Sequence, residues 1–194
     1  MFYLATLERP FGGAMVKRLE EMPDGELALA WRAGDGLALR VLIERHHGAA
    51  LGLALRLCGN RDRAEDLAQE ALVRALSRLH QYDPAQPFRP WLFRILGHLY
   101  IDNLRTTHEF LDDPPDPPRP VTDPAGDLFI QAVLGTLSPA HRAILVLREL
   151  VGLDYAELAD RLRVPIGTVR SRLSNARAAF KTAYLRLGGE EVVR

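Results

Sequence analysis

Side chains that form hydrogen bonds with nucleic acid are concentrated in one short segment near the C-terminus. The segment runs from Tyr155 to Arg177 and is rich in arginine, serine and asparagine. Guanidinium, hydroxyl and amide groups can bind both phosphate oxygens and base edges, as a protein surface in the major groove of DNA must. The composition of the segment therefore predicts a surface that reads DNA.

Two helices joined by a tight turn would position these side chains. The apolar residues of the first helix fall at helical spacing: Ala156, Leu158, Ala159 and Leu162. Pro165 suits the first turn of the next helix, where its missing N–H needs no partner. In that second helix, apolar residues three or four apart form one stripe: Ile166, Val169, Leu173, Ala176 and Phe180. The alternative is an ordinary helical hairpin with a solvated basic face.

Composition limits the class of protein. The chain has 194 residues, of which 47% are hydrophobic, so it can form one large domain or two small ones. The formal net charge is zero, which argues against a general nucleic-acid binder. However, Ser138–Leu187 contains nine Lys and Arg residues and four Asp and Glu residues, a local charge of +5. The C-terminal part is therefore basic, although the net charge of the whole chain is zero.

The single cysteine and the hydropathy pattern exclude several classes. Cys58 is the only cysteine, so neither an internal disulfide framework nor a zinc finger is expected. The uncharged stretch beside it, ending at Leu55, is too short to span a bilayer. Met1–Leu7 lacks the basic start of a signal peptide. We expect a cytoplasmic protein without membrane insertion.

The chain divides into three parts. Residues 23–107 are predicted to be helical almost throughout, and residues before about Glu20 fit no clear element. Asp24 and Asp62 are predicted helix caps, and Gly34-Asp-Gly36 is predicted to separate two helices. The second of these runs through Leu39, Leu42 and Ile43 towards Leu57. A proline-containing loop follows Leu79, and a further helix runs from Trp91 to about Arg105.

Residues 108–127 contain six prolines and five aspartates, which predicts an acidic linker. Residues 128–187 are predicted to form a small helical unit. The predicted fold class is therefore all-α, with two small helical domains joined by a flexible Pro/Asp-rich linker.

Several separated blocks together resemble one family. The blocks are Asp62–Leu76, Phe88–Arg105, Leu137–Leu150 and Tyr155–Arg177. The first block resembles the polymerase-binding helix of bacterial sigma factors, the second resembles their −10 helix, and the last two together resemble their −35 domain. The match is to the two-domain, extracytoplasmic-function (ECF) class and covers about Asp24 to Leu187. The resemblance implies a region 2 helical bundle followed by a region 4 helix-turn-helix domain.

The resemblance also implies roles for individual residues. The residues implied to bind core polymerase are Asp62, Glu65, Asp66, Leu67, Gln69 and Glu70. Those implied to bind and melt the −10 element are Phe88, Arg89, Trp91, Arg94, His98 and Arg105. Those implied to bind the −35 element are Arg148, Thr168, Arg170, Ser171, Arg172, Ser174, Asn175 and Arg177.

Two positions depart from the family pattern. Gly97-His98 stands where an Arg-Asn pair is common, which alters the expected −10 preference. Ser174-Asn175 replaces a bulky or basic pair, and Asn175 could read adenine through two hydrogen bonds. The loop Tyr82–Pro87 matches the base-reading loop of the family in position.

The predicted function is a non-catalytic sigma factor that directs promoter-specific initiation. Its implied partners are core polymerase (clamp and flap regions), promoter DNA and an anti-sigma protein. Neither a metal nor a cofactor is expected, because no nucleophile–base set, metal cluster or phosphate-binding loop is present. Two alternatives stay open: a stand-alone helix-turn-helix regulator, and a sigma-like decoy that sequesters an anti-sigma protein. The acidic linker would imitate RNA in the polymerase exit path, or serve only as a solubilising tether.

Overall fold

The structure of the protein is a computed structural model that describes residues 13–107 and 128–188. These two ranges contain nine α-helices, one 3-10 turn and no strand, which confirms the all-α class. The first range holds α1 (Gly13–Glu21), α2 (Asp24–Arg32), α3 (Gly36–Cys58), α4 (Arg61–Ser77), the turn η1 (Leu79–Gln81) and α5 (Phe88–Thr107). The second holds α6 (Leu128–Gly135), α7 (Pro139–Glu149), α8 (Tyr155–Leu162) and α9 (Ile166–Arg186). The predicted linker, 108–127, lies outside the described residues.

Side-chain caps determine where two of the N-terminal helices begin. Asp35 Oδ1 accepts hydrogen bonds from the backbone N–H groups of Leu37 and Ala38, at 2.9 and 3.3 Å, and so caps α3. Asn60 caps α4, because its Oδ1 accepts from the N–H of Arg63 at 3.1 Å. Asp62 was predicted to be this cap but lies within the first turn of α4.

Asp24 is a second predicted cap that the structure corrects. Helix α2 begins at Asp24, and the cap position belongs to Pro23. The Asp24 carboxylate instead joins α2 to α3: it accepts from Arg45 Nη1 at 2.7 Å and lies 2.8 Å from His46 Nε2. Helix α1, which the sequence analysis did not predict, packs on the same part of the bundle through buried Leu19.

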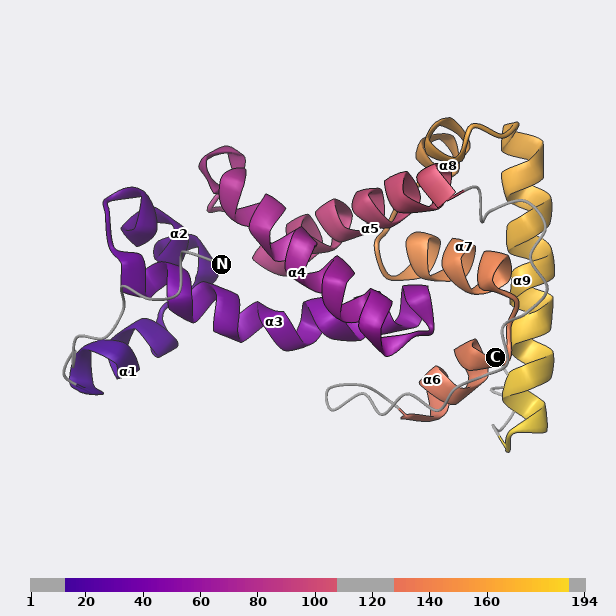
Figure 1. Ribbon diagram of the computed structural model, residues 1–194, viewed down its shortest axis with the longest axis horizontal. Helices are drawn as coiled ribbons and strands as arrows, with labels where there is room; N and C mark the ends of the chain where they lie inside the picture. The colour runs from indigo at the N-terminus through magenta and orange to yellow at the C-terminus, as the bar shows by residue number, and fades with distance from the viewer. Residues whose placement is uncertain (1–12, 108–127, 189–194) are drawn as a thin grey trace.

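The predicted pair of helices with a tight turn is present as α8 and α9. Helix α8 begins with a capping box, in which Asp154 and Glu157 each accept a hydrogen bond from the other's backbone N–H, at 2.8 and 2.9 Å. Arg163 ends α8 with a left-handed φ of 54°, and Pro165 is the cap residue of α9. The turn directs α9 along the outer edge of the molecule (Figure 1).

The two groups of helices pack against each other. Helix α7 lies alongside α3 (Figure 1), and α8 packs against α5, where Glu157 of α8 pairs with Arg94. Buried residues from both groups belong to one continuous hydrophobic core. The sequence pattern predicts two domains but not this contact between them.

An arginine from α7 closes the C-terminus of α3. Gly59 ends α3 with a left-handed φ of 65°. Arg142 is only 8% exposed, and its guanidinium donates to the carbonyl oxygens of Leu57 and Cys58 at 3.3 and 3.1 Å. A positive charge is favourable there, because the carbonyl groups at a helix C-terminus carry partial negative charge. A Cβ at position 59 would lie only 2.6 Å from the guanidinium carbon of Arg142.

Candidate nucleic-acid and polymerase interfaces

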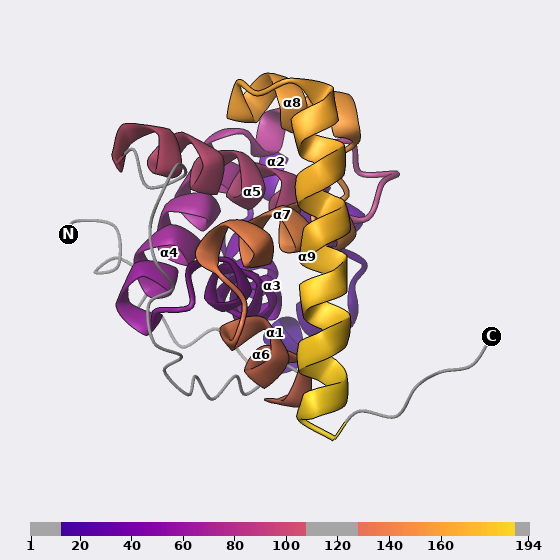
Figure 2. The same ribbon diagram turned by 90° about the vertical axis from the view of Figure 1, so that its right-hand side faces the viewer.

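Helix α9 presents a polar face to solvent. Its apolar stripe is buried through Val169, Leu173 and Ala176. Ile166, predicted to belong to this stripe, is exposed because it is the first residue of the helix. Arg170, Ser171, Ser174 and Asn175 are exposed on the opposite side. Figure 2 shows α9 in front of the other helices, at the surface of the molecule.

The other residues predicted to bind the −35 element are less available. Thr168 and Arg172 are half-buried. Arg148 donates to the carbonyl oxygen of Leu153 at 3.1 Å, and its guanidinium carbon lies 5.3 Å from the centre of the Tyr155 ring. This arginine therefore helps to hold the loop before α8, where it is half-buried.

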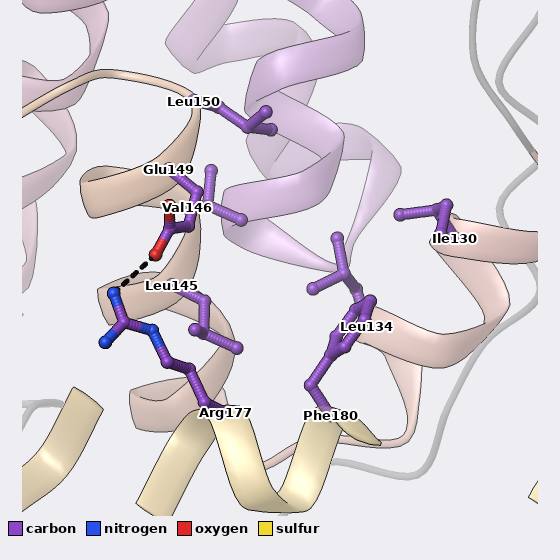
Figure 3. Close-up of a pocket in the computed structure, with 8 residues that line it drawn as sticks. All are labelled: Ile130, Leu134, Leu145, Val146, Glu149, Leu150, Arg177 and Phe180. Atoms are coloured by element: carbon purple, nitrogen blue, oxygen red, sulfur yellow. Dashed lines mark hydrogen bonds and ion pairs between the residues drawn. The ribbon is translucent and has the colours of Figure 1, made fainter. Parts of the chain in front are cut away.

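Arg177 turns towards α7, away from the polar face of α9. Its guanidinium donates to Glu149 Oε1 at 2.8 Å, on the rim of an apolar pocket of about 330 Å³ (Figure 3). The apolar side chains around this pocket come from α6, α7, α9 and the residue that follows α7: Ile130, Leu134, Leu145, Val146, Leu150 and Phe180. Leu150 is 47% exposed. This pocket forms only where three helices meet, so no local sequence pattern predicts it.

Helix α4 presents acidic and amide side chains outward. Asp62, Asp66 and Gln69 are exposed. Glu65 and Glu70 are also exposed, but each forms an ion pair on its own helix, with Arg61 at 2.7 Å and Arg74 at 2.9 Å. These pairs partly neutralise the ends of the surface, and Asp66 lies at its centre.

Two apolar residues of α4 differ from expectation. Leu67 is only 3% exposed, so its side chain lies in the core and cannot add apolar area to a partner surface. Val73 is 60% exposed and was missed. It lies seven residues after Asp66, two helical turns along the same face, and this spacing was the signal that could have identified it.

The beginning of α5 is an aromatic cluster. Phe88 is only 3% exposed, and its ring centre lies 4.8 Å from that of His46, 5.2 Å from that of Tyr82 and 5.3 Å from that of Trp91. Phe88 is therefore a core residue and is not available to stack on a base, a correction to its predicted role. Trp91 is half-buried.

Arg89 is exposed, with its guanidinium carbon 5.0 Å from the centre of the Phe93 ring. In the adjoining loop, the Tyr82 hydroxyl donates to the carbonyl oxygen of Gln86, and Asp83 Oδ1 accepts from the N–H of Ala85 at 3.0 Å. These bonds give the proposed base-reading loop a fixed shape.

Two of the remaining residues of the predicted −10 set, Arg94 and His98, lie beside the C-terminal helices. Arg94 forms an ion pair with Glu157 of α8. His98 is half-buried near Arg94 and Arg161. Arg105 Nη1 lies 3.8 Å from Oδ1 of Asp102, which is on the same helix. Arg94 and His98 thus lie together beside α8, and the Arg94 side chain is still 43% exposed.

The environment of His98 predicts that stability depends on pH. Burial lowers the pKa of His98, and the positive charges of Arg161 and Arg94 lower it further, against the smaller opposing effects of Glu157 and Asp102. The pKa of His46 is also lowered, mainly by burial. In the unfolded chain these rings have the ordinary pKa of about 6.5 and take up protons first. The free energy of unfolding should therefore be maximal above about pH 6.5 and should fall as the pH decreases below that value.

Urea unfolding at pH 7.5 and pH 5.5 measures this loss. His98→Gln should reduce the difference between the two pH values, whereas His47→Gln, at an exposed site on α3, should leave it unchanged. Equal pH dependence in wild type and His98→Gln would contradict the assignment.

The described residues contain neither a metal-binding cluster nor a membrane-spanning helix. No group of three or more His, Cys, Asp or Glu side chains there is placed to hold a metal ion. Among the same residues, no helix is both long enough and apolar enough to cross a membrane.

Comparison with protein families identifies both halves of the chain. The family model described as Sigma-70 region 2 matches residues 42–109, which include α4 and α5. The model described as Sigma-70, region 4 matches residues 130–180, which include α7, α8 and most of α9. The exposed face of α4 therefore lies in region 2, and the exposed face of α9 lies in region 4.

Individual relatives agree with the family models. The ECF RNA polymerase sigma factor SigE of Mycolicibacterium smegmatis is 36% identical over 152 residues, which are 72% of this chain and 59% of SigE. The ECF RNA polymerase sigma factor SigL of Mycobacterium tuberculosis is 31% identical over 80% of this chain and 94% of SigL. A solved structure of CnrH in complex with the cytosolic domain of CnrY is 30% identical over 87% of this chain and all of CnrH, with a TM-score of 0.48. Because regions 2 and 4 occur in order and relatives such as SigL match almost end to end, the chain belongs to the ECF class of RNA polymerase sigma factors.

Proposed function

We propose that three helices of this sigma factor make its separate contacts with core polymerase and with the two promoter elements. The exposed face of α4 binds the clamp of core polymerase, α5 and the loop before it open the −10 element, and α9 reads the −35 element. One observation carries this proposal: α4 and α9 present separate exposed polar faces, within the segments that match regions 2 and 4. The domain boundaries 23–107 and 128–187 are part of the same proposal.

The proposed −35 contact is an α-helix in the major groove. Arg170 and Asn175 would donate to base edges, and Ser171 and Ser174 would bind bases or phosphates. Each phosphate contact should steepen the dependence of binding on salt by about one unit of log–log slope. The local positive charge of the C-terminal part favours the encounter with DNA.

The proposed −10 contact is with single-stranded DNA. Arginines beside aromatic rings suit a melted strand, because bases stack on rings while guanidinium groups hold phosphates. Arg89 is already exposed for such a role, and Trp91, Arg94 and His98 are half-buried. The loop Tyr82–Pro87 would accept an extruded base, which lowers the cost of separating the strands.

The pocket between α6, α7 and α9 suits an apolar segment of the polymerase flap. Its lining is almost entirely apolar, and Leu150 on its edge is exposed (Figure 3). Burial of apolar surface would supply most of the binding energy there. This contact would hold region 4 on the polymerase while the exposed face of α9 stays free for DNA.

The remaining assignments follow from the same proposal. RNA synthesis belongs to core polymerase, and this chain acts as a non-catalytic subunit that needs no cofactor. The protein works in the cytoplasm, where polymerase and promoter DNA are found. An anti-sigma protein is a further candidate partner, and the relative CnrH has been solved in complex with the cytosolic domain of CnrY.

Transcription from a promoter library tests the proposed function. Purified core polymerase is assayed over many rounds with and without the full chain, and the transcripts are sequenced. We expect a set of start sites that depends on the chain and shares −10 and −35 sequences. If an active core gives no such transcripts and shows no binding to the chain, the sigma role is wrong, and the decoy or the stand-alone regulator takes its place.

A further inference from the structure

The proposed base-reading loop, Tyr82–Pro87, has one exposed side and one side that packs on the protein. Its exposed residues are Asp83, Ala85, Gln86 and Pro87. Tyr82 is only 2% exposed, and Pro84 is half-buried. Hydrogen bonds close the loop on itself: the N–H of Gln86 donates to the carbonyl oxygen of Asp83 at 3.0 Å, and the Tyr82 hydroxyl donates to that of Gln86. These bonds fix the shape of the loop, but its place relative to the helices requires contacts with other elements.

Arg32, the last residue of α2, holds the chain where it enters this loop. Its Nη2 lies 2.9 Å from the carbonyl oxygen of Leu79 and 3.3 Å from that of His80, and it also donates to that of Tyr82. The first two carbonyl groups belong to the turn η1. A cation is favourable at the end of a helical turn, because the carbonyl groups there carry partial negative charge. Arg32 therefore ties the C-terminus of α2 to the start of the loop.

Gly25, in the first turn of α2, contacts the middle of the same loop. A Cβ at position 25 would lie 2.2 Å from the carbonyl oxygen of Pro84 and 3.1 Å from its carbonyl carbon. Both are backbone atoms, so no rotation of a side chain could relieve the overlap. Gly25 and Arg32 are seven residues apart, which places them on the same side of the helix. This side of α2 thus supports the loop at two points.

Helix α2 is itself fixed to the helical bundle. Leu27 is fully buried in the core. The Asp24 carboxylate accepts from Arg45 Nη1 at 2.7 Å and lies 2.8 Å from His46 Nε2, both on α3. The His46 ring in turn packs on Phe88, the residue that follows the loop, with ring centres 4.8 Å apart. The support under the loop is therefore firm.

We propose that Arg32 and Gly25 are positioning residues for promoter reading: α2 holds the loop Tyr82–Pro87 where its exposed groups meet one extruded base of the −10 element. The inference rests on the proposed role of this loop. Neither residue touches the DNA. Both precede residues 42–109, the segment that matches region 2. Firm support matters because a hydrogen bond weakens steeply when its geometry is disturbed, and because an ordered loop loses less conformational freedom on binding.

The first pair of variants removes the tie at the start of the loop. Arg32→Ala deletes the guanidinium, and Arg40→Ala is the matched control, because Arg40 is an exposed arginine whose partner, Glu44, lies on its own helix. Arg32→Lys is the conservative variant. Only one nitrogen of Arg32 reaches the three carbonyl oxygens, and an ammonium nitrogen carries three donors that can replace it.

The second pair of variants disturbs the other point of support. Gly25→Ala adds a single methyl group, which the backbone at Pro84 can accommodate only if the loop moves. Gly48→Ala is the matched control, because Gly48 is an exposed glycine within α3 whose Cβ would meet no atom within 4 Å.

Each variant of the full chain is assembled with core polymerase and transcribes a promoter library in which the −10 and −35 bases are varied. For Arg32→Ala and Gly25→Ala, the preference for the best base at one −10 position should fall about fivefold or more, as for the loss of a base-reading contact. Preferences at the −35 element should equal those of wild type. Arg32→Lys should keep most of the −10 preference, and the two controls should keep all of it.

Base preference is a ratio of transcripts from one enzyme preparation, so a smaller amount of folded protein does not change it. A uniform loss of transcripts with unchanged preferences would therefore overturn the inference and leave α2 a purely structural role. Wild-type preferences in both Arg32→Ala and Gly25→Ala would overturn it as well. Wild-type transcription tests the proposed function separately: no transcripts that depend on the chain would refute the sigma role itself.

Discussion

Asp66→Arg should weaken the binding of this sigma factor to core polymerase by at least about 2 kcal/mol, near thirtyfold in Kd. Asp66 is exposed at the centre of the α4 surface. Its neighbours Glu65 and Glu70 already pair with arginines of the same helix. Reversal of this charge would place an arginine against the basic clamp surface that the proposed function requires.

Equilibrium titration of labelled full-length protein with purified core measures the change. Glu26→Arg serves as the matched control, because it reverses an exposed carboxylate on α2 and should bind core as wild type does. Binding of Asp66→Arg to −35 duplex should also equal that of wild type. Equal losses of core binding in Asp66→Arg and Glu26→Arg would show that net charge, rather than the α4 surface, determines the affinity.

Arg170→Ala should weaken binding to −35 duplex by about 1–3 kcal/mol, from fivefold to more than a hundredfold. Arg170 is exposed on the polar face of α9, one residue beyond buried Val169, so truncation removes a contact without disturbing the core. Discrimination among bases at one promoter position should relax at the same time. Affinity for core polymerase should not change.

Electrophoretic or fluorescence titrations with promoter duplex at several salt concentrations measure this loss. Arg186→Ala removes the same charge from the exposed far end of α9 and should have little effect. If Arg170→Ala lowers affinity equally for every sequence and only flattens the salt dependence, Arg170 binds phosphate, and base reading belongs to another residue. An unchanged affinity would remove Arg170 from the interface.

Helical periodicity was sufficient to predict most of the fold. Turn residues such as Gly59 and Pro165 correctly separated α3 from α4 and α8 from α9. Cap assignment was less successful. A capping side chain competes with other partners, and Asp24 pairs with Arg45 and His46, which follow it by more than twenty residues. Such long-range partners are not visible in a local pattern.

The candidate interfaces were predicted in part. Apolar spacing identified the exposed face of α9, which depends on one helix alone. It could not show that Phe88 is enclosed by His46, Tyr82 and Trp91, because these residues lie on different elements. The apolar pocket beside Arg177 and the contact between Gly25 and Pro84 also depend on how separate elements meet. Tertiary packing, rather than propensity, decides which arginines face solvent.

The contact between Arg142 of α7 and the C-terminus of α3 limits which residues position 59 can accept. A left-handed residue at a helix end is usually glycine and sometimes asparagine, so position 59 alone would tolerate Asn. Here the guanidinium of Arg142 occupies the space that any Cβ would need. A side chain at position 59 would therefore displace this guanidinium and cost it the hydrogen bonds to the carbonyl oxygens of Leu57 and Cys58. The residue accepted at position 59 thus depends on a side chain more than eighty residues further along the chain.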